Sequence, residues 1–241
     1  MLRLILTLFV SFFVGALICA GVALAARAGW LPATVDRRFL NFLNIVVGAA
    51  SFHGSILICL LVFLPAHRVS WGDAFGFSKP GAWAAAGWGL LTICFALPVV
   101  MLLQTLSAKL LAQFGIQPTQ QSTVNVLQGM LPIGQFFVYG FVTILLAPFA
   151  EEMLFRGILY PAIKQGGFPR LALWGTALLF AATHVNLMAF IPLTFLALVL
   201  TALYEKTENL IAPIVTHVMF NAVNFYFIVA PAKWKPDWFT Q

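Results

Sequence analysis

Apolar runs of membrane-spanning length cover almost the whole chain. A helix needs about 20 mostly apolar residues to cross a bilayer, and only 8% of the 241 residues are charged. Seven runs are candidates for spans: 4–26, 42–64, 82–106, 132–160, 171–186, 188–204 and 210–230. The sequence therefore predicts an all-α fold, a polytopic transmembrane helix bundle of about seven spans, with no room left for a separate soluble domain.

The first run has a second interpretation. It follows Arg3 and leads into "VALAARAG", a pattern that is also typical of a cleaved signal peptide. Its apolar stretch is longer than the core of about 7–15 residues found in such peptides. This length favours a retained helix over a signal peptide.

The chain is expected to form one integral membrane domain, 1–241, in three parts. Residues 1–106 supply N-terminal spans, and 132–230 supply the helices that carry the candidate chemistry. Between them, 107–131 is polar but almost uncharged, too long for a simple turn and too polar for a span. We expect this segment to lie along the membrane surface, either as a plain loop or as a gate for substrate entry.

The net charge of +6 does not indicate nucleic acid binding, because the basic residues are scattered among loops between the spans. Lys and Arg in such loops lie beside lipid headgroups. The expected partners are therefore membrane lipid and a membrane-associated protein or peptide. Short loops and compact size favour a bacterial plasma membrane as the location.

Two adjacent glutamates interrupt an apolar run in "EEMLFRG", which begins at Glu151. Ionisable residues are costly inside a membrane and are candidates for function. Glu152 and Arg156 lie four apart, on one helix face, where they can form an ion pair; contact with substrate is the alternative role for the arginine. Glu151 is rotated by about 100° from Glu152, which leaves it available for chemistry.

Two later motifs add histidines and an asparagine. "FAATH" ends at His184, and "HVMFN" places His217 and Asn221 on one face of the last span. At about 1.5 Å per residue, Glu151, His184 and His217 lie roughly 18, 21 and 13 Å from the same membrane face. We therefore expect these side chains to converge inside the C-terminal helices.

The converging residue types suit hydrolysis by an activated water molecule. A buried glutamate can act as general base, a histidine can share the water or bind a metal, and histidine with asparagine can donate hydrogen bonds to an oxyanion. The sequence contains no H-E-x-x-H, G-x-S-x-G or G-x-G-D pattern. The Glu/His/His/Asn set is thus the catalytic candidate.

The order "EEMLFRG", "FAATH", "HVMFN", at intervals of about 33 residues, resembles the CPBP (Abi) family of intramembrane proteases, which includes the type II CAAX prenyl endopeptidases. Residues 130–225 carry the resemblance. It implies that Glu151 and His184 activate water and that His217 and Asn221 stabilise the oxyanion. It also implies supporting roles for the two remaining charged residues of the first motif, Glu152 and Arg156.

The resemblance leaves the cofactor open, because members of this family have been discussed both as metal-dependent and as glutamate-activated proteases. With a divalent metal such as zinc, Glu151, His184 and His217 would supply three ligands and leave one position open. Without a metal, the glutamate would do the base chemistry alone.

The function predicted from these motifs is an intramembrane endopeptidase acting on a membrane-associated protein, with a prenylated CAAX protein as one candidate substrate. One alternative is a bacteriocin self-immunity or scaffold protein, with or without proteolysis. A proton-coupled transporter is another alternative, although the chain has no internal repeat of the kind common in transporters.

Several other polar residues lie within the predicted spans. Interhelical hydrogen bonds are the favoured role for these residues, as they are for most polar side chains in membrane helices. They are His53, Thr183, Asn186, Thr216 and Asn224. The alternative is a hydrogen bond that supports the catalytic residues or, for the histidine, a direct functional role.

Overall fold

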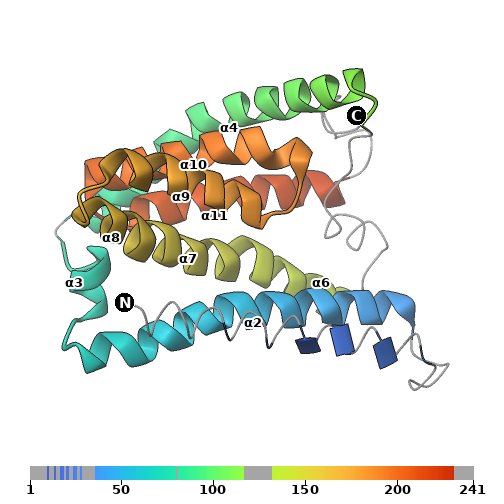
Figure 1. The fold of residues 1–241 in the computed structure, drawn as a ribbon, viewed down its shortest axis with the longest axis horizontal. Helices are drawn as coiled ribbons and strands as arrows, with labels where there is room; N and C mark the ends of the chain where they lie inside the picture. The colour runs from blue at the N-terminus through green and yellow to red at the C-terminus, as the bar shows by residue number, and fades with distance from the viewer. Residues whose placement is uncertain are drawn as a thin grey trace. The chain divides into compact units, whose positions relative to one another are not determined.

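The computed structural model describes residues 36–79, 81–116 and 132–230, with a few positions between 10 and 28. Regular structure within this part of the chain is helical throughout (Figure 1). The elements are α2 (Arg37–Ala66), α3 (Trp71–Phe75), α4 (Ala82–Gln113), α6 (Ile133–Phe141), the π-helix η1 (Val142–Leu146), α7 (Ala147–Glu152), the π-helix η2 (Met153–Leu159), α8 (Tyr160–Gln165), α9 (Pro169–Thr183), α10 (Leu187–Thr207) and α11 (Ile211–Val229). The predicted all-α class is confirmed, while most of the first predicted span lies outside the described residues.

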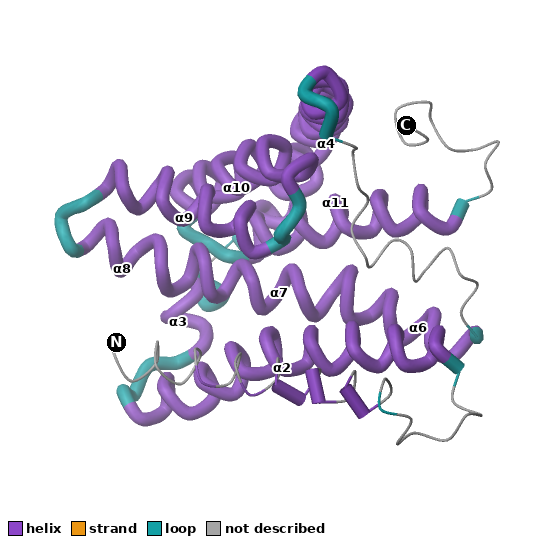
Figure 2. The backbone as a smooth tube through the Cα atoms, turned by 45° about the vertical axis from the view of Figure 1, so that its right-hand side comes forward, coloured by secondary structure: helices purple, strands orange, loops and turns teal. Residues whose placement is uncertain are grey.

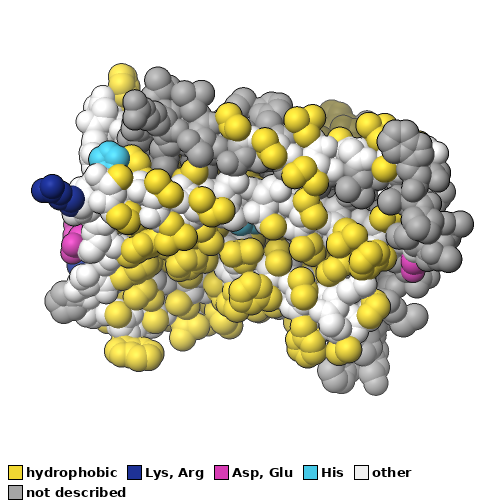
Figure 3. All heavy atoms as spheres, turned by 90° about the horizontal axis from the view of Figure 1, so that it is seen from below, with side chains coloured by type: hydrophobic (Ala, Val, Ile, Leu, Met, Phe, Trp, Pro, Cys, Tyr) yellow, Lys and Arg dark blue, Asp and Glu magenta, His cyan; other side chains and the backbone are white. Residues whose placement is uncertain are grey.

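Helices long and apolar enough to cross a membrane number five within the described residues. They are Phe39–Ala66, Ala82–Gln113, Ile133–Gln165, Leu187–Thr207 and Ile211–Val229. The predicted span 171–186 forms α9, whose 15 residues rise only roughly 22 Å. Hydrophobic side chains cover the middle of the face drawn in Figure 3, and the charged side chains visible there lie at its ends. The protein is therefore an integral, multi-pass membrane protein.

The chain divides into two compact units. One comprises 1–70 with 122–150, and in it α2 packs beside η1. The other comprises 71–121 with 151–241, and in it α4 contacts both α10 and α11 while α9 packs against α8 and α10 (Figure 2). All six predicted site residues belong to this second unit.

The contact between α4 and α11 depends on a glycine. A Cβ added at Gly89 would lie 2.6 Å from the carbonyl oxygen of Ala212, too close for any larger residue. Thr216 donates a hydrogen bond of 3.0 Å to the Gly89 carbonyl and so joins the two helices. Because His217 follows Thr216 directly, this contact also fixes the height of His217 in the bundle.

The predicted boundary at residue 107 was wrong. Helix α4 continues to Gln113, because its leucines and alanines favour helix up to that point. It ends in a Schellman motif, in which Gly115 has φ 72° and the Ile116 N–H donates to the Leu111 carbonyl. Residues 117–131 of the predicted surface segment lie outside the described residues.

Exposed ion pairs mark one end of α10. Lys164 pairs with Glu205, and Lys79 pairs with Glu208 just beyond the helix. The hydrogen bond and positive charge of Lys79 lower the pKa of the Glu208 carboxyl. These pairs are accessible to water.

Candidate active site

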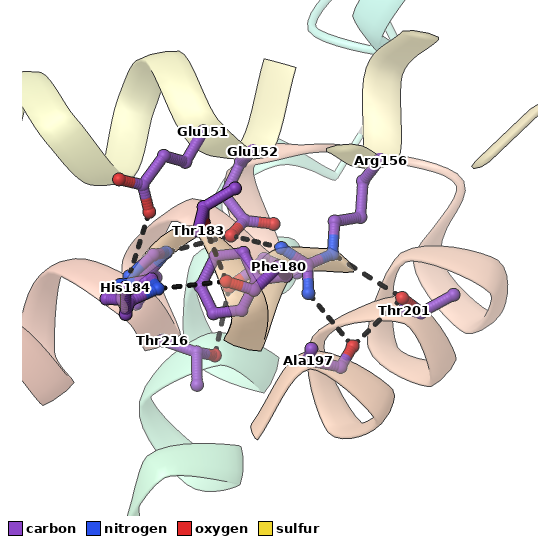
Figure 4. A network of polar contacts seen from close by, with 11 residues as sticks. Glu151, Glu152, Arg156, Phe180, Thr183, His184, Ala197, Thr201 and Thr216 are labelled. Atoms are coloured by element: carbon purple, nitrogen blue, oxygen red, sulfur yellow. Dashed lines mark hydrogen bonds and ion pairs between the residues drawn. The ribbon is translucent and has the colours of Figure 1, made fainter. Parts of the chain in front are cut away.

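The centre of the site is a buried ion pair. Glu152 ends α7, Arg156 lies in η2, and their side chains are 0% and 2% exposed. The arginine Nη1 donates to Oε1 of the glutamate over 2.8 Å (Figure 4). The predicted pairing of these two residues is confirmed. Since each charge neutralises the other, both can remain ionised away from water.

His217 shares the same carboxylate oxygen. Its Nδ1 lies 2.8 Å from Oε1 of Glu152. An oxygen that also accepts from Arg156 belongs to an ionised carboxylate, so Nδ1 of His217 carries the proton. In the neutral ring Nε2 then presents a lone pair, and it lies 3.8 Å from Oε2 of Glu151. The two predicted catalytic groups are thus brought together.

His184 lies at the C-terminal end of α9 and is fixed in a similar way. Its Nδ1 lies 2.9 Å from the Phe180 carbonyl, which also accepts the Thr183 hydroxyl over 2.7 Å. A carbonyl can only accept, so Nδ1 is the donor and Nε2 carries the lone pair. His184 was predicted within a span, but α9 ends one residue before it.

The turn that follows His184 is strained. Val185 has φ 47°, a left-handed conformation that a β-branched residue rarely adopts. Asn186 then caps α10 by accepting the Ala189 N–H over 2.9 Å. Strained backbone at such a place is common in functional sites.

The ring of Phe180 packs against both histidines. Its centroid lies 5.0 Å from the His184 ring and 5.6 Å from the His217 ring. Phe155 contacts it edge-on, and the Arg156 Cζ lies 5.0 Å from its centroid. The four-residue spacing between Phe180 and His184 was the one signal in the sequence, and the prediction missed this packing role.

Arg156 has two more partners, both on α10. Its Nη2 donates to the Ala197 carbonyl over 2.9 Å, and its Nε to Thr201 Oγ1 over 3.4 Å. Neither residue was predicted. They lie more than forty positions along the chain from Arg156 and carry no motif, so no local signal could have identified them.

Three further predicted polar residues lie on α11. Asn221 lies one turn beyond His217 on α11 and is partly buried. Thr216 makes the predicted interhelical bond, to α4. Asn224, by contrast, donates to the Phe220 carbonyl of its own helix.

The predicted metal set does not form a centre in this structure. Within the described part of the chain, no three His, Cys, Asp or Glu side chains are grouped so that they could hold an ion. Glu151 and His217 face one another, and each histidine ring uses its Nδ1 for another partner. A metal-binding role for Glu151, His184 and His217 stays a prediction.

Apolar spanning helices around a buried Glu/Arg/His network define the class of this protein: a multi-pass membrane protein with a polar site inside its C-terminal helices. Residues 133–223 match the family described as "Type II CAAX prenyl endopeptidase Rce1-like". This segment runs from α6 into α11 and contains every predicted site residue. This match confirms the predicted resemblance over residues 133–223.

Two bacterial proteins are similar in sequence. YpbD of Bacillus subtilis (strain 168) is 40% identical over 87 residues, which cover 34% of this chain and 41% of YpbD. The UPF0177 protein YaiF of Lactococcus lactis subsp. lactis (strain IL1403) is 26% identical over 203 residues, covering 78% and 88% of the two chains. The match thus spans about two fifths of the first relative. No solved structure matches the chain.

Proposed function

We propose that this protein is an intramembrane endopeptidase that hydrolyses a peptide bond of a membrane-associated protein through a water molecule activated by Glu151. One observation carries the proposal: Oε2 of Glu151 lies 3.8 Å from Nε2 of His217, whose other nitrogen is fixed by the buried Glu152–Arg156 pair. The family of residues 133–223 supports CAAX-type proteolysis and makes a prenylated peptide the first substrate to test.

The gap between Glu151 and His217 suits a bridging water molecule, because polar groups separated by more than about 3.5 Å are often joined by one. Glu151 accepts a proton from this water as its oxygen attacks the scissile carbonyl carbon. The second hydrogen of the water is donated to the Nε2 lone pair of either His217 or His184, and this hydrogen bond orients the water. The proton held by Glu151 then passes to the leaving amine as the C–N bond breaks.

The tetrahedral intermediate needs hydrogen-bond donors for its oxyanion. Asn221 can donate from its amide. His217 can donate from Nε2 only when its ring carries a second proton, because the first is committed to Glu152. The proton taken up by Glu151 can be shared with Nε2, and the anionic Glu152 stabilises the resulting imidazolium.

The test is cleavage of a peptide library that includes farnesylated CAAX peptides by the purified protein in detergent, read by mass spectrometry. Glu151→Gln should lower the rate by about 10²–10⁴-fold, the usual contribution of a general base. Glu205→Gln is the matched control, since Glu205 is a partly exposed glutamate paired with Lys164 at the end of α10. The absence of products, or products made equally well by Glu151→Gln, would contradict the proposal.

A further inference from the structure

Arg156 is held by contacts on two helices. Toward α7 its Nη1 donates to Glu152, and toward α10 its Nη2 and Nε donate to Ala197 and Thr201. The side chain is almost wholly buried, so water cannot replace a lost partner. The α10 contacts therefore decide where Nη1 points.

The hydroxyl of Thr201 is oriented to accept from Arg156. It donates its own hydrogen to the Ala197 carbonyl over 2.9 Å, which turns its lone pairs toward Nε of the arginine. Thr201 is 1% exposed. The same Ala197 carbonyl receives Nη2, so a single turn of α10 forms a cradle with two acceptors for the guanidinium.

The contacts continue from Arg156 to His217 through one atom. Oε1 of Glu152 accepts both the arginine Nη1 and the histidine Nδ1, each over 2.8 Å. Oε2 of the same carboxylate is buried and has no hydrogen-bond partner among the described residues. A displacement of the guanidinium therefore turns the carboxylate, and the imidazole turns with it.

We propose that Thr201 is a positioning residue for His217, acting through Arg156 and Glu152, an inference that rests on the proposed function. Thr201 touches none of the reacting atoms. Its hydroxyl fixes the guanidinium, the guanidinium fixes Oε1, and Oε1 fixes the ring whose Nε2 faces Glu151. The site is thus assembled by α7, η2, α10 and α11, although α10 supplies none of the predicted catalytic residues.

The experiment compares Thr201→Val, which keeps the shape but removes the acceptor, with Thr201→Ser, which keeps the hydroxyl. Thr176→Val is the control, because Thr176 is 4% exposed and its hydroxyl donates to the Ala172 carbonyl of its own helix, α9. The first readout is the Nδ1–H resonance of His217 in detergent-solubilised protein labelled with nitrogen-15 histidine. The chain has four histidines, and loss of the signal in His217→Gln assigns it.

We expect Thr201→Val to shift the His217 Nδ1–H resonance, while Thr201→Ser and Thr176→Val leave it in place. In the peptide assay, kcat of Thr201→Val should fall about five- to tenfold with KM unchanged. A fall of this size corresponds to the loss of one charge-assisted hydrogen bond whose donor–acceptor distance is long. An unmoved His217 resonance, or equal shifts in Thr201→Val and Thr176→Val, would overturn the inference.

The resonance does not depend on proteolysis, so the two proposals fail separately. A wild-type protein that cleaves none of the peptides contradicts the proposed function, and the resonance still decides whether Thr201 positions His217. A wild-type protein that cleaves peptides while Thr201→Val changes neither readout contradicts the positioning role alone.

Discussion

Removal of Arg156 should destabilise the protein more than removal of any exposed charge. Arg156→Met keeps an unbranched apolar stem but deletes the donor to Glu152 and both contacts with α10. The carboxylate of Glu152, which is 0% exposed, then keeps its contact with His217 but has lost its counter-charge. Breaking one side of a buried ion pair costs about 3–5 kcal/mol of unfolding free energy, and we expect a loss in this range.

A double-mutant cycle separates this loss from simple packing damage. Glu152→Gln alone leaves a buried guanidinium without its counter-charge and should also be costly. The double variant, Glu152→Gln with Arg156→Met, buries no net charge. Its loss of unfolding free energy should therefore be smaller than the sum of the two single losses, by about 2 kcal/mol or more. Peptidase activity should stay low in the double variant, because a neutral amide cannot stabilise the His217 imidazolium.

The assay is unfolding of the detergent-solubilised protein by increasing SDS, followed by tryptophan fluorescence. Lys164→Met and Glu205→Gln form the control cycle, since this ion pair is 46% and 42% exposed. Exposed pairs contribute about 0–1 kcal/mol, so the control coupling should be small. Additive losses at Glu152 and Arg156, or a coupling no larger than that of the control pair, would refute the argument that the buried charges depend on one another.

Two further predictions concern the backbone around the site. Gly89→Ala should destabilise the protein by about 1–3 kcal/mol, because the new methyl group meets the Ala212 carbonyl. Gly87→Ala is the control and should be neutral or stabilising, because its new methyl group meets no atom within 4 Å. Unfolding in SDS distinguishes the two variants. Val185→Gly should raise stability by about 1 kcal/mol by relieving the left-handed conformation, and it should lower kcat because the turn after His184 becomes looser. A stabilised variant with unchanged kcat would show that the strained turn does not position His184.

The helices were predictable because their signal is local. An apolar run of about 20 residues specifies a span without reference to any other part of the chain. The ion pair of Glu152 with Arg156 was predictable for the same reason, since a four-residue spacing places two side chains on one face. The polar residues after 107 do not end α4, because the leucines and alanines among them favour helix as far as Gln113. A left-handed glycine, Gly115, sets the actual end.

The interior of the site was less predictable, because its contacts join distant helices. The sequence indicated that Glu151 and His217 would lie at similar depth, but not that Nε2 of the histidine would face the carboxylate. Spacing also could not show that one oxygen of Glu152 accepts hydrogen bonds from both Arg156 and His217. Nor could it show that α10 holds the arginine through Thr201. These features depend on rotamers and on the packing of four elements.

The charges of the site explain why two glutamates stand side by side. Arg156 neutralises Glu152, so the group of two carboxylates and one guanidinium carries a net charge of about −1 when Glu151 is ionised. That charge resides on the carboxylate facing His217. In the proposed reaction Glu151 accepts the proton of the attacking water, and this group becomes neutral as the negative charge moves to the oxyanion nearby. The reaction then transfers charge within the site without adding any, which keeps its cost low where the surrounding helices are apolar.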